Sequence, residues 1–111
     1  MLTKAPVLRF MDKDQKYFVE FSHACDMVLQ QHPLGTNISV SVSTNDASLP
    51  PIIRDLHPLR IWSSDHGVGM IIGEGWNGFG IEWWEDESNT NLWTLSTTCE
   101  SHTRVAYTET R

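Results

Sequence analysis

The chain of 111 residues lacks basic side chains over a long stretch of its second half. No Lys or Arg occurs between Arg60 and Arg104, and no Lys follows Lys16. The same stretch holds seven acidic residues and all five tryptophans. Its negative field repels phosphate backbones and attracts cations, because the sign of the surface charge steers association. We therefore expect no nucleic-acid partner and favour a cationic one.

Cysteines and long apolar runs are also scarce. The two cysteines, Cys25 and Cys99, lie 74 positions apart, and we expect both to be reduced and buried. No signal-like stretch opens the chain and no run is long enough to span a bilayer, so we expect a cytoplasmic protein without a membrane partner. With 40% hydrophobic and 20% charged residues, residues 1–111 are predicted to form a single globular domain.

Motifs that indicate a reaction are missing. Residues 73–78 match the pattern G-x-G-x-x-G, but a strand-like run follows them where a dinucleotide site needs a helix. Residues 64–66 read Ser-Asp-His; adjacent residues cannot form a catalytic triad, so we interpret them as a turn in which the Asp bonds to local backbone. The five histidines have none of the spacings of zinc sites. We predict no catalytic residue, no metal site and no cofactor.

One main helix is predicted near the N-terminus. Apolar residues recur at helical spacing across residues 14–31, and Asp12 or Asp14 is placed to cap the start. The alternative is that residues 16–21 form the second strand of a hairpin and that the helix begins after them. In addition, residues 6–11 are predicted to form a short strand.

Short strands joined by turns make up the rest of the chain. Residues 37–43 alternate apolar and polar side chains, which is typical of a strand with one buried face. Residues 44–58 are expected to be a loop with one helical turn after Pro51. Further strands are predicted at residues 59–63, 68–75, 79–85, 92–98 and 104–108. Since such strands favour antiparallel pairing, the predicted fold class is α+β: an antiparallel meander of five to six strands with the helix packed on one face.

Two candidate turns set a register for this sheet. Asn77 and Gly78 are a strong signal for a two-residue hairpin turn, and His66 and Gly67 can close the preceding hairpin in the same way. These turns predict two rows across the sheet, Trp62–Ile71–Trp84 and Arg60–Gly73–Glu82. Side chains alternate between the two faces along a strand, so the sequence also predicts which of them lie on the face that the helix covers. Its members are Ile61, Val68, Met70, Ile72, Trp76, Phe79, Ile81 and Trp83.

The opposite face is the candidate binding surface, with a low floor of glycines between two tryptophans. Its predicted binding residues are Trp62, Trp84, Glu82, Arg60, Ile71 and Gly73, together with Glu85 and Asp86 of the following turn. Two large rings on a solvated face need a cover, which could be another subunit, the loop 44–58 or a ligand. A carboxylate beside aromatic rings suits a cation; the alternative is that Glu82 pairs with Arg60 across Gly73.

Three functions remain open at this stage. The first is non-enzymatic protein binding, either to a second copy in a homo-oligomer or to a basic partner, with Trp62 and Trp84 as anchors. The second is binding of a cationic or aromatic small molecule in a groove above the glycines. The third is a small enzyme that uses Glu82 or a histidine as a base.

In size and charge over the whole chain, the sequence resembles small acidic accessory proteins carried on mobile elements, including toxin-immunity proteins and integron-cassette products. The resemblance implies an acidic, aromatic face that masks a basic active site. It includes no shared motif, so no functional residue is carried over from it.

Overall fold

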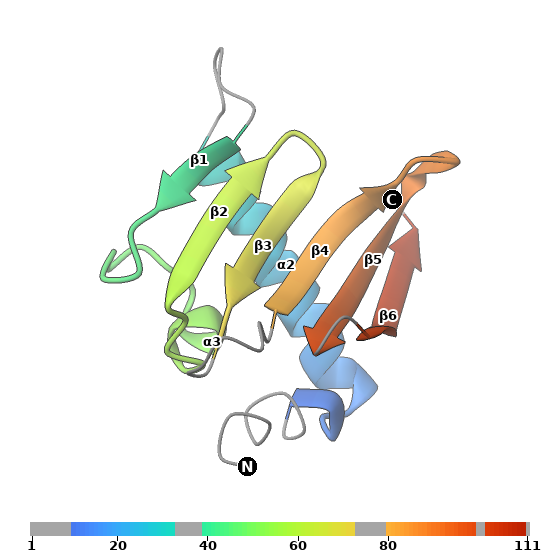
Figure 1. The fold of residues 1–111 in the computed structure, drawn as a ribbon, viewed down its shortest axis with the longest axis horizontal. Coiled ribbons are helices and arrows are strands. Elements are labelled where there is room, and N and C mark those ends of the chain that lie inside the picture. Colours follow the sequence, from blue (N-terminus) through green and yellow to red (C-terminus); the bar gives the residue numbers. More distant parts are fainter. Residues whose placement is uncertain (1–9, 33–38, 73–79, 100–101, 111) are drawn as a thin grey trace.

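The computed structural model describes residues 10–32, 39–72, 80–99 and 102–110. Its fold is α+β: a main helix, α2, lies across one face of a six-stranded antiparallel sheet (Figure 1). The strand order β1-β2-β3-β4-β5-β6 follows the chain, so each strand pairs with the next one. The predicted fold class and meander are confirmed. In the described part of the chain, no helix combines the length and the apolar character needed to cross a bilayer.

From residue 14 onward, the described elements match the predicted ones, with shifted boundaries. Helix α2 spans Gln15–Gln31, and α3, the turn predicted after Pro51, spans Pro51–Arg54. The strands are β1 (Ser39–Val42), β2 (Arg60–Ser64), β3 (Gly67–Ile71), β4 (Gly80–Asp86), β5 (Asn89–Cys99) and β6 (His102–Thr110).

The single long helix is confirmed, and the alternative strand over residues 16–21 is wrong. Asp14 is the N-cap residue, and its carboxylate accepts a hydrogen bond of 2.9 Å from the Tyr17 N–H. This bond satisfies one of the amides that a helix start leaves without an intrahelical partner. The predicted strand at residues 6–11 is wrong at Phe10 and Met11, which are helical; the other four residues lie outside the described ranges.

Phe10 and Met11 do not form the predicted strand because the Phe10 ring packs against α2. Its ring lies 5.1 Å from that of Phe21 and 5.5 Å from that of Phe18, measured between centroids. Phe10 has an exposed fraction of 1%. The helical turn therefore places this ring against α2, and that contact outweighs the weak local preference for an extended chain.

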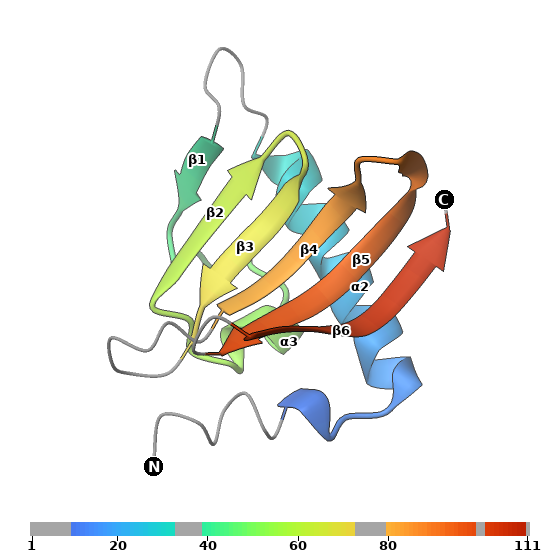
Figure 2. The ribbon, with the colours of Figure 1, turned by 45° about the vertical axis from the view of Figure 1, so that its right-hand side comes forward.

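The core lies between α2 and the sheet, and Figure 2 shows the helix lying behind the sheet. All described members of the predicted helix-covered face have an exposed fraction of 3% or less: Ile61, Val68, Met70, Ile72, Ile81 and Trp83. Trp76 and Phe79 lie outside the described residues. Trp83 also stacks on Trp93 of β5, with centroids 4.2 Å apart and rings inclined by 17°. Cys25 of α2 is a buried free thiol, as expected.

The pairing registers differ from the predicted ones. The β2–β3 turn consists of Asp65 and His66, so Trp62 faces Gly69 instead of Ile71. In the same hairpin Arg60 faces Ile71 instead of Gly73. Both changes are shifts of two residues along β3.

The next hairpin is shifted further. Ile71 faces Gly80 instead of Trp84, a shift of four residues, and Trp83 faces Val68 instead of Ile72. The predicted turn at residues 77–78 lies outside the described residues. Both predicted rows are therefore wrong, and the observed rows are Trp62–Gly69–Glu82 and Arg60–Ile71–Gly80. Because each shift is an even number of residues, the described side chains still lie on their predicted faces.

The first shift has a local cause in the turn. The Ser64 hydroxyl accepts a 3.3 Å hydrogen bond from the His66 N–H and donates one of 3.3 Å to the Gly67 carbonyl. Ser64, and not the predicted Asp65, thus makes the local backbone contacts of the turn. Gly67 pairs with Ser64 and Trp84 as part of β3, so close to β4 that a Cβ on it would lie 1.9 Å from the carbonyl oxygen of Trp83. That close approach needs a glycine.

Candidate functional site

The face of the sheet turned away from α2, called the outer face below, holds Trp62 close to the backbone. A Cβ on Gly69 would lie 2.3 to 2.6 Å from three atoms of the Trp62 indole, so the ring lies directly over this glycine. Trp62 also borders a hollow of about 390 Å³, the Trp62 hollow, together with Ser39, Ser41, Arg60, Ile61 and Ile71. The glycine floor predicted for a ligand is filled at Gly69 by the protein's own indole.

Trp84 lies on the same face and is held by a hydrogen bond. Its indole Nε1–H donates to the hydroxyl of Ser96 on β5 at 3.1 Å. Ser96 faces Glu82, and Trp84 itself faces Thr94, so the ring leans diagonally over β5. Thr94 and Ser96 are both buried. The bond fixes the orientation of the ring while one side of Trp84 stays partly exposed.

The turns after β2 and after β4 lie at the same end of the sheet (Figure 1). Between them is a hollow of about 500 Å³ that we call the acidic hollow, lined by His66, Trp84, Glu85, Asp86, Glu87 and Ser88. The His66 imidazole lies between two carboxylates, with Nε2 3.4 Å from Asp65 and Nδ1 3.8 Å from Glu85. The Glu85 N–H donates to the His66 carbonyl at 2.7 Å, which ties the two turns together.

Asp86 has a structural role in this hollow in addition to its charge. One carboxylate oxygen accepts hydrogen bonds from the Ser88 N–H at 2.8 Å and from the Ser88 hydroxyl at 2.5 Å. The side-chain bond first, and then the backbone bonds, hold the pKa of Asp86 below its ordinary value. Hydrogen bonds to an ionised carboxylate favour the charged form, so Asp86 is negatively charged at neutral pH.

The eight predicted binding residues fall into two groups instead of one. Arg60, Trp62 and Ile71 line the Trp62 hollow, whereas Trp84, Glu85 and Asp86 line the acidic hollow. From the strand spacing and the rise per residue, the backbones of the two tryptophans lie roughly 12 Å apart.

The remaining two predicted residues are placed differently. Glu82 is exposed and lies between the two groups on the outer face, next to Gly69. Within the described ranges no ion pair joins it to Arg60. Gly73 lies outside the described residues, as does the whole G-x-G-x-x-G match at residues 73–78.

The predicted binding residues did not include His66 and Ser88, and Glu87 was expected only to steer a partner by its charge. A signal was available, because alternate turns of a meander lie at the same end of the sheet. The turn after β2 and the turn after β4 therefore had to be neighbours across β3. The sequence also gave no sign that Ser39 and Ser41 of β1 would border Trp62, since that contact depends on the β1–β2 register.

Segment 44–58 does not cover the tryptophans. Its residues Leu49 and Ile53 are buried in the core beside α2, on the other side of the sheet. Of the three expected covers for Trp62 and Trp84, a second subunit or a ligand therefore remains. In addition, each ring is partly covered by the neighbouring strand: Trp62 lies over Gly69 of β3, and Trp84 is hydrogen-bonded to Ser96 of β5.

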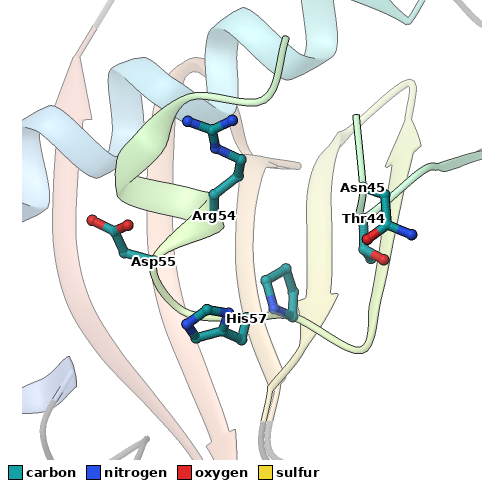
Figure 3. A pocket seen from close by; sticks show the side chains of 6 residues that line it. Thr44, Asn45, Arg54, Asp55 and His57 are labelled. Atoms are coloured by element: carbon teal, nitrogen blue, oxygen red, sulfur yellow. The ribbon is translucent and has the colours of Figure 1, made fainter. Parts of the chain in front are cut away.

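A further hollow of about 590 Å³ lies beside α3, bordered by Thr44, Asn45, Arg54, Asp55, His57 and Pro58 (Figure 3). In Figure 3 the side chains of Arg54, Asp55 and His57 point in different directions. His57 has a positive φ of 51°, and its N–H donates to the Arg54 carbonyl at 2.9 Å, which ends the helix. These residues therefore shape a chain reversal and do not converge on one point, as acid–base catalysis would require.

Within the described ranges, no three His, Cys, Asp or Glu side chains form a group that could hold a metal ion. Compared with protein-family profiles, with curated proteins and with solved structures, the chain shows no significant match. The candidate site therefore rests on its own geometry: two half-buried tryptophans on one open face, one of them at the wall of an acidic hollow.

Proposed function

We propose that this protein is a non-enzymatic binding protein whose outer face contacts a basic partner protein in the cytoplasm. The observation that supports this most is the acidic hollow, which Trp84 lines together with Glu85, Asp86 and Glu87, while the Trp84 indole is hydrogen-bonded to Ser96. An arginine or lysine side chain of the partner occupies this hollow. Binding masks the partner's basic surface, as the resemblance to immunity proteins implies.

The chemistry of the hollow suits a guanidinium group in particular. A planar guanidinium stacks on an aromatic face while it donates hydrogen bonds to carboxylates. Cation–π contact and Coulomb attraction each contribute on the order of 1 kcal/mol in a partly desolvated setting. The fixed ring and the ionised Asp86 are already in place, so little order has to be created on binding.

The outer face supports a protein partner better than a small molecule. The space over Gly69, where a small ligand would lie, is filled by Trp62. The remaining surface extends from the acidic hollow past exposed Glu82 to the Trp62 hollow. An extended surface with aromatic anchors is typical of a contact with another protein. A second copy is a poor partner for this face, because it would set like charges against each other.

The test uses isothermal titration calorimetry with a synthetic oligoarginine peptide at low ionic strength. We expect binding that weakens with salt, and that weakens about fivefold in Trp84→Ala and in Glu87→Gln, since each loses on the order of 1 kcal/mol. Glu20→Gln, an exposed charge removal on α2, is the matched control and retains the affinity of the unmodified chain. Absence of binding, or equal affinity in all four proteins, would overturn the proposal.

A further inference from the structure

The two edges of the sheet differ in length and in protection. β1 forms one edge with four residues, whereas β6 forms the other with nine, and within the described residues β6 pairs with β5 alone. Native proteins protect long edges with prolines, lysines, bulges, inward-pointing charges or a covering element. β6 has no proline and no lysine, and its two charged residues besides His102 are Arg104 and Glu109, of opposite sign. Among the described strands, none pairs with the free side of β6.

A bulge in β6 changes the usual alternation of its side chains. Leu95 faces Tyr107 while the next residue, Ser96, faces Val105, so Ala106 is an extra residue in β6. Val105 therefore lies on the outer face with Ser96, and Tyr107 lies on the helix side with Leu95. Ala106 packs against the core together with Tyr107. Going outward from the Ala106–Tyr107 bond in either direction, the residues therefore occupy the two faces in the same order.

This order of faces makes β6 complementary to itself. In an antiparallel pair of two β6 strands with a two-fold axis between Ala106 and Tyr107, every residue meets one from the same face. The pairs are Thr103 with Thr110, Arg104 with Glu109, Val105 with Thr108, and Ala106 with Tyr107. Sliding the strand by one residue sets Thr103, on the outer face, against Glu109, on the helix side, and the match is lost.

We infer that β6 is a dimerisation edge, which pairs with β6 of a second copy of this chain in that register. Arg104 of each copy then faces Glu109 of the other, twice in the dimer, and opposite charges directly across a strand pair are favourable. Glu109 is already held on the helix side, 3.8 Å from His23 of α2. The exposed fraction of 56% at Val105 falls as it packs on Thr108 of the second copy.

The dimer edge goes beyond the proposed binding of a basic partner, because it uses another surface. β6 is two strands away from β4, so the acidic hollow stays open in the dimer. Each dimer then presents two such hollows, and a partner with two basic sites gains from engaging both. Loss of the dimer and loss of oligoarginine binding are separate measurements.

The test is sedimentation velocity on the full chain and on charge-reversed variants. Unmodified protein is expected to sediment as a dimer whose fraction rises with concentration. Arg104→Glu and Glu109→Arg each place like charges opposite one another, so each variant alone is expected to have a dimer dissociation constant at least about tenfold higher. Mixed in equal amounts, the two variants regain opposite charges at both positions and form a heterodimer.

The controls separate this geometry from general charge effects. Lys16→Glu makes the same charge change as Arg104→Glu at an exposed site on α2 and is expected to dimerise like the unmodified chain. Far-ultraviolet circular dichroism verifies that each variant is folded. A monomer at every concentration up to about 1 mM, single variants that dimerise as well as the unmodified chain, or a mixture that stays monomeric would overturn the inference.

Discussion

Trp83 and Trp84 are neighbours in β4, yet they lie on opposite faces of the sheet. Trp83 has an exposed fraction of 0% and stacks on Trp93 under α2. Trp84 lies on the outer face, half-buried, with its indole nitrogen bonded to Ser96. One step along a strand therefore separates a ring that holds the core together from one that stays available for contact.

The two faces also bury their rings by different means. On the covered face, apolar side chains from α2 and the sheet close around Trp83. On the outer face, Trp62 lies over Gly69, and Trp84 leans over Thr94 and Ser96. Small residues thus let an aromatic ring rest on the sheet without a second layer, and both tryptophans remain partly exposed. The covered face therefore depends on α2 to bury its apolar side chains, whereas the outer face partly buries its two tryptophans against the sheet itself.

The largest expected effect compares the two neighbouring tryptophans directly. Trp83→Ala leaves a large cavity in the core and is expected to lower the free energy of unfolding by about 4 kcal/mol. Trp84→Ala loses one hydrogen bond and a partly buried ring, and we expect a loss of about 1 kcal/mol. Urea denaturation followed by circular dichroism measures both. Equal losses would show that the outer ring is as much part of the core as the covered one.

A glycine series sharpens the comparison at the backbone. Gly67 has a φ of 153°, and an added Cβ would lie 1.9 Å from a backbone oxygen, so Gly67→Ala is expected to cost about 2 to 3 kcal/mol. At Gly69 the added Cβ meets the Trp62 ring, which can rotate away, and we expect about 1 kcal/mol. At Gly80 the nearest atom is 3.6 Å away, so the change stays within about 0.5 kcal/mol.

The same denaturation experiments test this order, and tryptophan fluorescence adds a second measurement. Gly69→Ala alone is expected to shift the emission to the red, because it drives Trp62 into water. A cost at Gly69 equal to that at Gly67 would mean that the ring is fixed as firmly as the backbone.

The covered face also predicts a loss of stability at alkaline pH. Burial first, and then the charges of Asp26 and Glu109, raise the pKa of the Cys25 thiol. Burial likewise raises the pKa of Tyr17. The unfolded chain loses these protons at a lower pH than the folded one, so stability is full below the unfolded pKa and falls as pH rises above it.

The variant Cys25→Ala measures the thiol's share of this loss. Between pH 9 and 10.5 it is expected to lose stability less steeply than the unmodified chain, by up to about 1.4 kcal/mol per pH unit. Urea titrations at several pH values provide the slopes. Identical slopes would show that the thiol is not held in its neutral form by the fold.

The smallest effect concerns the acidic hollow at the end of the sheet. Ser88→Ala removes the hydroxyl that donates to Asp86, so the pKa of Asp86 is expected to rise toward its ordinary value. Because the folded pKa is depressed, the stability that Asp86 contributes is present above the unfolded pKa and is lost as pH falls through the folded one. NMR titration of the carboxyl carbon tests this. An unchanged pKa would assign the shift to the backbone bonds alone.

Local sequence patterns predicted much of this fold. The apolar spacing of residues 14–31 and the cap at Asp14 located α2, and alternation located β1 and the covered face of β2 to β4. Phe10 and Met11 were missed because their helical turn depends on packing against Phe21 and not on their own preference. The sequence predicted that Trp62, Trp84 and Glu82 share the outer face. It did not predict their arrangement, since Trp62 and Trp84 belong to different rows and different hollows.

The amino-acid sequence by itself determined the helix, the meander type of sheet, the faces of Trp62, Trp83 and Trp84 and the negative charge of the region around them. Only the tertiary structure decided the registers, the meeting of His66 with Glu85, and the bulge at Ala106. The physical reason is that side-chain alternation repeats every two residues, so it fixes which face a residue occupies but permits any even shift. The choice among those shifts is made by contacts between strands, such as the Gly67 backbone against the Trp83 carbonyl.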